Sequence, residues 1–219
     1  MIDNNEHLSN LNFFGKITAS VTHELNNVFS IINEYNGLLE DQIFMAESEL
    51  TMNIEKLSRI QDRLDKQIAR GENIIRNLNK FAHSTDHESI EFNLNEYLEN
   101  IIYLTTRLAN LKKIKLNFDN AIEPITIVNN PYEIMKNIFL VISYLLETLR
   151  SQSEICFTIE NNEKLSMIIL VLKPDTENFP ANTADNLKMR INSDMLDIGL
   201  IEPDKMQIMI PNKSNVNKF

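Results

Sequence analysis

One short stretch near the N-terminus combines three residue types that are suited to nucleophilic group transfer. His23 is followed directly by Glu24, and Asn27 lies four residues after the histidine. A neutral imidazole is a nucleophile near neutral pH, and a neighbouring carboxylate can keep one ring nitrogen protonated while the other presents its lone pair. An amide one helical turn away can donate a hydrogen bond to the transferred group or orient a water molecule.

The residues around His23 predict a long helix that leaves the imidazole in solvent. Apolar residues recur at steps of three and four, which indicates an amphipathic helix from about Leu8 to Ala46. The stripe consists of Phe14, Ile17, Val21, Leu25, Val28, Ile32, Tyr35 and Leu39. Because His23 is two residues from both Val21 and Leu25, it points away from this stripe at 100° per residue.

A second apolar stripe predicts a second helix, from about Met52 to Ala82. Its members are Leu57, Ile60, Leu64, Ile68, Ile75, Leu78 and Phe81. The connection is short, so the helices are expected to be antiparallel neighbours. One hairpin has too little interior to bury both stripes. The sequence therefore predicts a homodimer in which two hairpins form a four-helix bundle.

The chain beyond the hairpin predicts a different architecture. Residues 83–91 are polar and are interpreted as a linker, and a small α/β sandwich is expected over residues 92–219, so that the fold class is α+β. The sequence gives no secondary-structure assignment for the segment from Lys173 to Gly199. The expected helices are 94–111 and 131–149, and the expected strands are 114–118, 125–128, 154–159, 165–172 and 206–210.

Both predicted helices carry segments that resemble a known family. Residues 20–30, Ser-Val-Thr-His-Glu-Leu-Asn-Asn-Val-Phe-Ser, resemble the phosphoacceptor box of histidine kinases, in the variant with a His-Glu-x-x-Asn core. Residues 74–82 resemble the closing helix of the same dimerisation and phosphotransfer domain. The resemblance implies that His23 is phosphorylated, that Glu24 assists as a base, and that Asn27 supports phosphatase activity toward the partner.

The second half resembles the ATP-binding domain of histidine kinases without its nucleotide motifs. The position of the magnesium-binding asparagine is occupied by Tyr144, and Asn137 lies too early to replace it. Residues 173–178, Lys-Pro-Asp-Thr-Glu-Asn, stand where the family has an Asp-x-Gly-x-Gly turn. Gly199 is the only glycine after residue 71, so a glycine-rich phosphate lid is absent. A degenerate domain of this kind resembles the ChpT-like histidine phosphotransferases.

Composition narrows the classes of partner and setting. The formal net charge of -10 argues against a nucleic-acid partner. The single cysteine, Cys156, is expected to be a buried reduced thiol, which together with the lack of a signal peptide or membrane span predicts a cytoplasmic protein. His83 and His87 are four residues apart, but a solvated linker is preferred to a metal site there.

The expected function is phosphoryl transfer between His23 and the aspartate of a response-regulator receiver domain, without ATP. No cofactor of its own is expected, and Mg²⁺ is expected on the receiver. Two alternatives stay open from sequence. One is a response-regulator phosphatase that uses Glu24 and Asn27, and the other is a non-catalytic adaptor that binds response regulators. The upstream kinase, the receiving regulator and the direction of phosphoryl flux do not follow from the residues.

Overall fold

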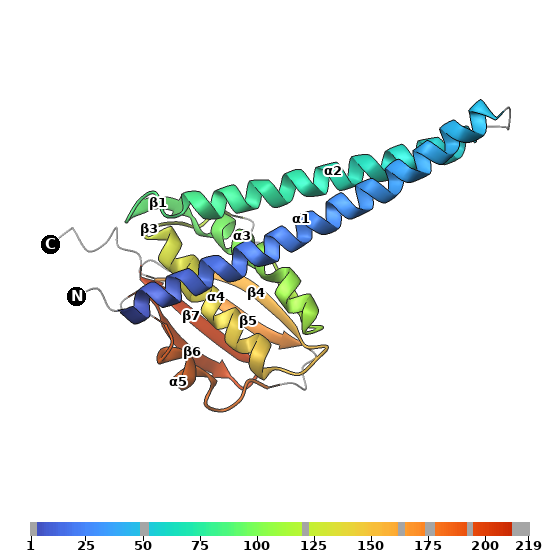
Figure 1. The fold of residues 1–219 in the computed structure, drawn as a ribbon. Helices are drawn as coiled ribbons and strands as arrows, with labels where there is room; N and C mark the ends of the chain where they lie inside the picture. The colour runs from blue at the N-terminus through green and yellow to red at the C-terminus, as the bar shows by residue number, and fades with distance from the viewer. Residues whose placement is uncertain are drawn as a thin grey trace. The chain divides into compact units, whose positions relative to one another are not determined.

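The computed structural model describes residues 4–48, 53–119, 123–161, 165–173, 178–191 and 195–211. Two long helices come first, α1 (Asn4–Glu47) and α2 (Ile54–His83), and a domain built on a β-sheet follows (Figure 1). The predicted α+β class is confirmed. Both helices begin and end within a few residues of the positions expected from the apolar stripes.

The chain divides into two compact units at positions that differ from the expected domain boundaries. One unit, here called the hairpin unit, is Thr18–Asn79. The other, here called the sheet unit, combines Met1–Ile17 with Lys80–Phe219. The first turns of α1 and the end of α2 are thus part of the sheet unit. The expected linker also differs, because its last two residues already belong to strand β1 (Ile90–Asn93).

The interior of the hairpin unit is narrow. Val21, Val28, Ile60 and Ile74 are buried, with exposures between 1% and 4%. Gly71 of α2 faces Val28, since a Cβ atom at Gly71 would lie 3.5 Å from Cγ1 of Val28. Several large apolar side chains of this unit remain 47% to 73% exposed, namely Phe29, Ile43, Phe44, Ile54, Ile68 and Ile75. Of the two predicted stripes, only Ile68 and Ile75 are among these exposed side chains. One hairpin therefore leaves some of its apolar side chains in solvent.

Two capped helices support the sheet unit. Helix α3 (Leu94–Leu111) begins after Asn93, whose side-chain oxygen accepts a hydrogen bond from the backbone N–H of Asn95 at 3.0 Å. Helix α4 (Pro131–Thr148) begins after Asn130, which caps the N–H of Glu133 in the same way at 3.0 Å. Asparagine is among the preferred N-cap residues, and proline is favoured in the first helical turn.

The strands form two sheets. Strands β1 and β3 (Thr126–Asn129) make a two-stranded antiparallel sheet. The larger sheet has the order β2-β4-β5-β7-β6, in which β2 pairs with β4 in parallel and the other pairs are antiparallel. Its strands are β2 (Lys115–Phe118), β4 (Glu154–Asn161), β5 (Leu165–Lys173), β6 (Asp197–Glu202) and β7 (Lys205–Pro211).

Burial alternates along the central strands, as expected for a sheet that is covered on one face. Ile155 and Phe157 of β4 are fully buried, whereas Cys156 between them is only half-buried. The prediction of a buried Cys156 was therefore wrong, because an apolar run in a strand sends every second side chain to the opposite face. The six-residue helix α5 (Thr183–Lys188) lies within the segment that gave no assignment from sequence, and strand β6 begins in it.

Candidate functional site

His23 lies on the outer face of α1, within the hairpin unit. Its side chain is exposed, while Val21 and Val28 on the opposite side of the helix are buried. Glycine is absent from α1 between Gly15 and Gly37, and proline is absent from the whole helix, so the turn that carries the imidazole is regular. The predicted outward orientation of His23 is confirmed.

The two neighbours expected to work with His23 share the same stretch of α1. Asn27 is exposed one turn further along, and Glu24 is half-buried beside the histidine. Within the described part of the chain, none of these three side chains makes a hydrogen bond or an ion pair with another residue. The imidazole, the carboxylate and the amide are therefore available to an incoming group. Their roles stay a prediction.

In the sheet unit, the position expected for a magnesium-binding asparagine holds a packed aromatic ring. Tyr144 of α4 is 4% exposed, and its hydroxyl accepts a hydrogen bond from Nδ2 of Asn186 on α5 at 3.0 Å. The guanidinium carbon of Arg190 lies 5.0 Å from the centre of the Tyr144 ring. Asn137 is fully buried, and its amide donates to the backbone oxygen of Glu133 at 2.8 Å.

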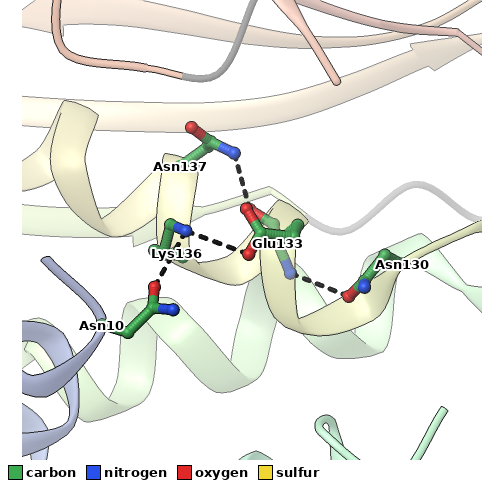
Figure 2. Close-up of polar contacts among 5 residues, drawn as sticks. All are labelled: Asn10, Asn130, Glu133, Lys136 and Asn137. Carbon is green, nitrogen blue, oxygen red and sulfur yellow. Dashed lines mark hydrogen bonds and ion pairs between the residues drawn. The ribbon is translucent and has the colours of Figure 1, made fainter. Parts of the chain in front are cut away.

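A buried polar network that sequence reasoning missed lies at the first turns of α4. Nζ of Lys136 donates to Oε1 of Glu133 and to Oδ1 of Asn10, both at 2.9 Å, although Lys136 is only 5% exposed (Figure 2). Two asparagine side chains bind the backbone of Glu133 (Figure 2). The oxygen of Asn130 accepts from the N–H of Glu133, and the amide of Asn137 donates to its backbone oxygen. A lysine among the apolar residues of this helix was the only signal in the sequence.

The same region contains a cluster of five aromatic rings. Phe13 is 1% exposed, and its ring centre lies 4.8 Å from that of Phe139, 5.1 Å from Phe81 and 5.8 Å from Tyr132. Phe14 stacks on Tyr132 at 5.6 Å with an interplanar angle of 23°. Burial raises the pKa of Tyr132 to about 12, and the negative charge of Glu133 adds to this shift. Phe14 and Phe81, expected in the hairpin seam, thus belong to the sheet unit.

The two linker histidines are not arranged as metal ligands on one helical face. Helix α2 ends at His83, whose Nδ1 lies 2.8 Å from Oδ2 of Asp86, and His87 lies beyond the helix. Among the described residues, no group of three histidine, cysteine or acidic side chains is placed to hold a metal ion. None of the described helices combines the length and the apolar character needed to cross a membrane.

Comparison with known proteins finds similar solved structures at low sequence identity. No family model and no curated protein matches the sequence. Among solved structures, the nucleotide-free catalytic domain of the histidine kinase ThkA aligns with a TM-score of 0.47 and 15% identity, over 57% of this chain and 97% of that domain.

Two longer structures align over more of the chain. The histidine kinase AdeS of Acinetobacter baumannii has a TM-score of 0.46 and 10% identity, over 88% of this chain and 98% of that one. ThkA in complex with the response regulator protein TrrA has a TM-score of 0.46 and 18% identity, over 95% and 64%. The functional assignment of the site therefore rests on the residues of this chain.

Proposed function

We propose that this protein is a histidine phosphotransferase of two-component signalling, which moves a phosphoryl group between His23 and the aspartate of a response-regulator receiver domain. The observation that carries the proposal is the exposed imidazole of His23 on a regular helix, beside an acid and an amide that are not engaged elsewhere. A partner of the size of a receiver domain needs such an open convex surface, because the reacting aspartate must approach from outside.

The transfer step needs only groups that this chain and the receiver supply. One ring nitrogen of His23 attacks the phosphorus of the receiver's aspartyl phosphate, the bond between phosphorus and the aspartyl oxygen breaks, and the aspartate leaves as a carboxylate. Glu24 accepts the hydrogen bond or the proton of the other ring nitrogen, so that positive charge on the ring is stabilised. The receiver brings Mg²⁺, which neutralises charge on the phosphoryl oxygens.

Asn27 has a supporting role in this proposal. Its amide, one turn from His23, is placed to donate to a phosphoryl oxygen or to orient a water molecule. The first action assists transfer and the second assists hydrolysis. Transfer is preferred because His23 is exposed on the helix surface, whereas a pure phosphatase has no need of a nucleophilic imidazole.

The proposal includes the absence of ATP-dependent autophosphorylation. The sequence resemblance aligns Tyr144 with the magnesium asparagine, and the hydroxyl of Tyr144 is hydrogen-bonded to Asn186. The glycine-rich elements that would cradle phosphates are missing from the sequence. Phosphoryl groups therefore reach His23 from a phosphorylated receiver rather than from a bound nucleotide.

A homodimer is part of the same proposal. The exposed apolar side chains of the hairpin unit lie on both of its helices, with Phe29 on α1 and Ile68 on α2 at 57% and 50% exposure. Large apolar side chains that are exposed to solvent on both helices are suited to a protein–protein interface. A second hairpin supplies a matching surface, which completes a four-helix bundle.

The direct test mixes the protein with a receiver domain that has been phosphorylated with a labelled small-molecule phosphodonor. We expect label on the wild-type protein that is stable in base and labile in acid, as a phosphohistidine is. His23→Ala should acquire none. His7→Ala is the matched control, since His7 is also exposed on α1, and it should be labelled like the wild type. Label that persists on His23→Ala contradicts the proposal.

An Asn27→Ala variant separates transfer from hydrolysis. If transfer is the function, this variant keeps most of the labelling at His23, because the amide is not the nucleophile. If hydrolysis is the function, release of free phosphate falls by about 10² to 10³, the scale for losing one positioned polar group. Binding of the receiver without label or phosphate release would instead identify an adaptor.

A further inference from the structure

We propose that a groove between the first turns of α1 and helix α4 binds a small amphipathic anion, that is, a molecule with an apolar body and one anionic group. The groove has a volume of about 430 Å³. It lies entirely within the sheet unit, so the proposal is independent of the role of His23. We call it the α1–α4 groove.

The lining of the α1–α4 groove combines apolar and polar side chains. Its apolar members are Leu8 and Phe13 of α1 and Phe139 and Leu140 of α4. Phe13 and Phe139 are nearly fully buried and fix the floor, whereas Leu8 is 58% exposed at the margin. The volume falls in the range of small-molecule sites, which are mostly apolar with a few placed polar groups. An apolar body gains free energy by displacing water from these side chains.

Two cations at the groove give it a preference for anions. Lys16 lies with Nζ 5.9 Å from the centre of the Phe139 ring, and among the described residues it has no carboxylate within ion-pair distance. Arg190 lies 3.5 Å from Glu147 through one terminal nitrogen, Nη1. The guanidinium carries further N–H donors, so it can bind a second anionic group.

The groove has one more cationic side chain than it has acidic side chains. Glu147 is the only acid in its lining and is already paired with Arg190, whereas Lys16 is unpaired in the described structure. Lys16 is solvent-exposed beside the apolar side chains of the groove, so its ammonium group is accessible to an anion. A carboxylate or sulfonate with an apolar tail satisfies both features, while a cationic amphiphile of the same length does not.

The experiment uses the full chain and two chemically defined probes. Anilinonaphthalene sulfonate, an apolar anion, is titrated and followed by its fluorescence, and decanoate below its micelle concentration is added as a competitor. We expect saturable binding and displacement by decanoate. Decyltrimethylammonium, which has the same chain with a cationic head, should not displace the probe, and neither should ATP with magnesium. Displacement by ATP would identify a nucleotide site and overturn the proposal.

Variants place the binding in the groove. Lys16→Ala and Arg190→Ala should each weaken the decanoate-sensitive binding by about tenfold, since each removes a charged hydrogen-bond donor. Ser143→Phe, which fills the groove from α4, should abolish it. Lys188→Ala is the matched control, because it removes a cation near Arg190 whose partner, Asp197, is outside the groove. It should bind like the wild type.

Binding to the exposed hairpin surface is excluded by a further variant. Phe29→Ala reduces the apolar surface of the hairpin unit and leaves the groove unchanged, so decanoate-sensitive binding should persist in it. Circular dichroism on every variant shows that it is folded. If folded Ser143→Phe retains the decanoate-sensitive signal, or if Phe29→Ala loses it, the groove is not the site.

Discussion

The ammonium group of Lys136 donates a hydrogen bond to the side-chain oxygen of Asn10 at 2.9 Å, across 126 residues of sequence (Figure 2). This contact joins α4 to the first turns of α1, and the same ammonium group lies 5.8 Å from the centre of the Tyr132 ring. The same ammonium group also pairs with Glu133 at 2.9 Å. The contact shows why residues before Thr18 belong to the sheet unit.

Removing the ammonium group should destabilise the sheet unit strongly. In Lys136→Met the carboxylate of Glu133 loses its partner in a buried site, which costs about 3 to 5 kcal/mol of the free energy of unfolding. Urea unfolding followed by circular dichroism measures this. Lys66→Met removes the exposed pair with Asp62 and should change stability by less than about 1 kcal/mol. Equal effects of the two variants would contradict a buried network.

Phe13 is predicted to be the largest single contributor of α1 to the sheet unit. Phe13→Ala should lower the free energy of unfolding by about 3 to 5 kcal/mol, because the ring fills the space between Phe81 and Phe139. Leu11→Ala, on the same helix, removes a side chain that is 69% exposed and should have little effect. Thermal unfolding of both variants checks this, and a small effect at Phe13 would mean that α1 does not pack on α4.

The homodimer is predicted to depend on side chains that are exposed in the single hairpin. Phe29→Asp and Ile68→Asp should convert the dimer into a monomer with unchanged helix content, since an unpaired charge in an apolar interface is costly. Multi-angle light scattering gives the mass directly. Ser58→Asp, at another exposed position of α2, is the control. A wild-type monomer at micromolar concentration would refute the prediction.

No saturable binding of ATP with magnesium is expected in a calorimetric titration. Tyr144 is the residue that the sequence resemblance aligns with the metal-binding asparagine. Its hydroxyl bonds to Asn186, and Arg190 lies over its ring. Tyr144→Asn alone should not create binding, because the glycine-rich elements are missing as well. Micromolar affinity of the wild type would show that Tyr144 does not correspond to the magnesium position.

A weak dependence of stability on acid is predicted at the junction of α2 and α3. The ammonium group of Lys80, 2.7 Å from Oε2 of Glu96, lowers the pKa of that carboxyl below its usual value of 4.5. The ion pair therefore stabilises the fold at higher pH, and this contribution is lost as the pH falls below about 4.5 through the folded-state pKa.

The size of this effect is small, because the Glu96 side chain is 58% exposed and solvent screens the pair. We expect less than about 1 kcal/mol. Urea unfolding between neutral pH and about pH 3 should show a flatter profile for Glu96→Gln than for the wild type. Glu99→Gln, an exposed acid on the same helix, should keep the wild-type profile. Equal slopes for all three proteins would rule out a role for Lys80.

The sequence by itself determined the elements that depend on local patterns. The periodicity of apolar residues predicted both long helices and the outward direction of His23, and α3 was predicted with the residue bounds that the structure has. The helix expected over 131–149 begins at Pro131 in the structure, as predicted. These features follow from side-chain spacing over a few turns, which a single sequence contains in full.

Only the tertiary structure decided which residues the two apolar stripes pack against. Phe14 and Phe81 fit the seam of a hairpin by spacing, yet they pack on Tyr132 and Phe13 in the sheet unit. Periodicity gives the direction of a side chain but not its partner. The partner of Lys136 is likewise set by contacts distant in sequence, because burying an ammonium group requires acceptors that only the assembled fold brings within hydrogen-bonding distance.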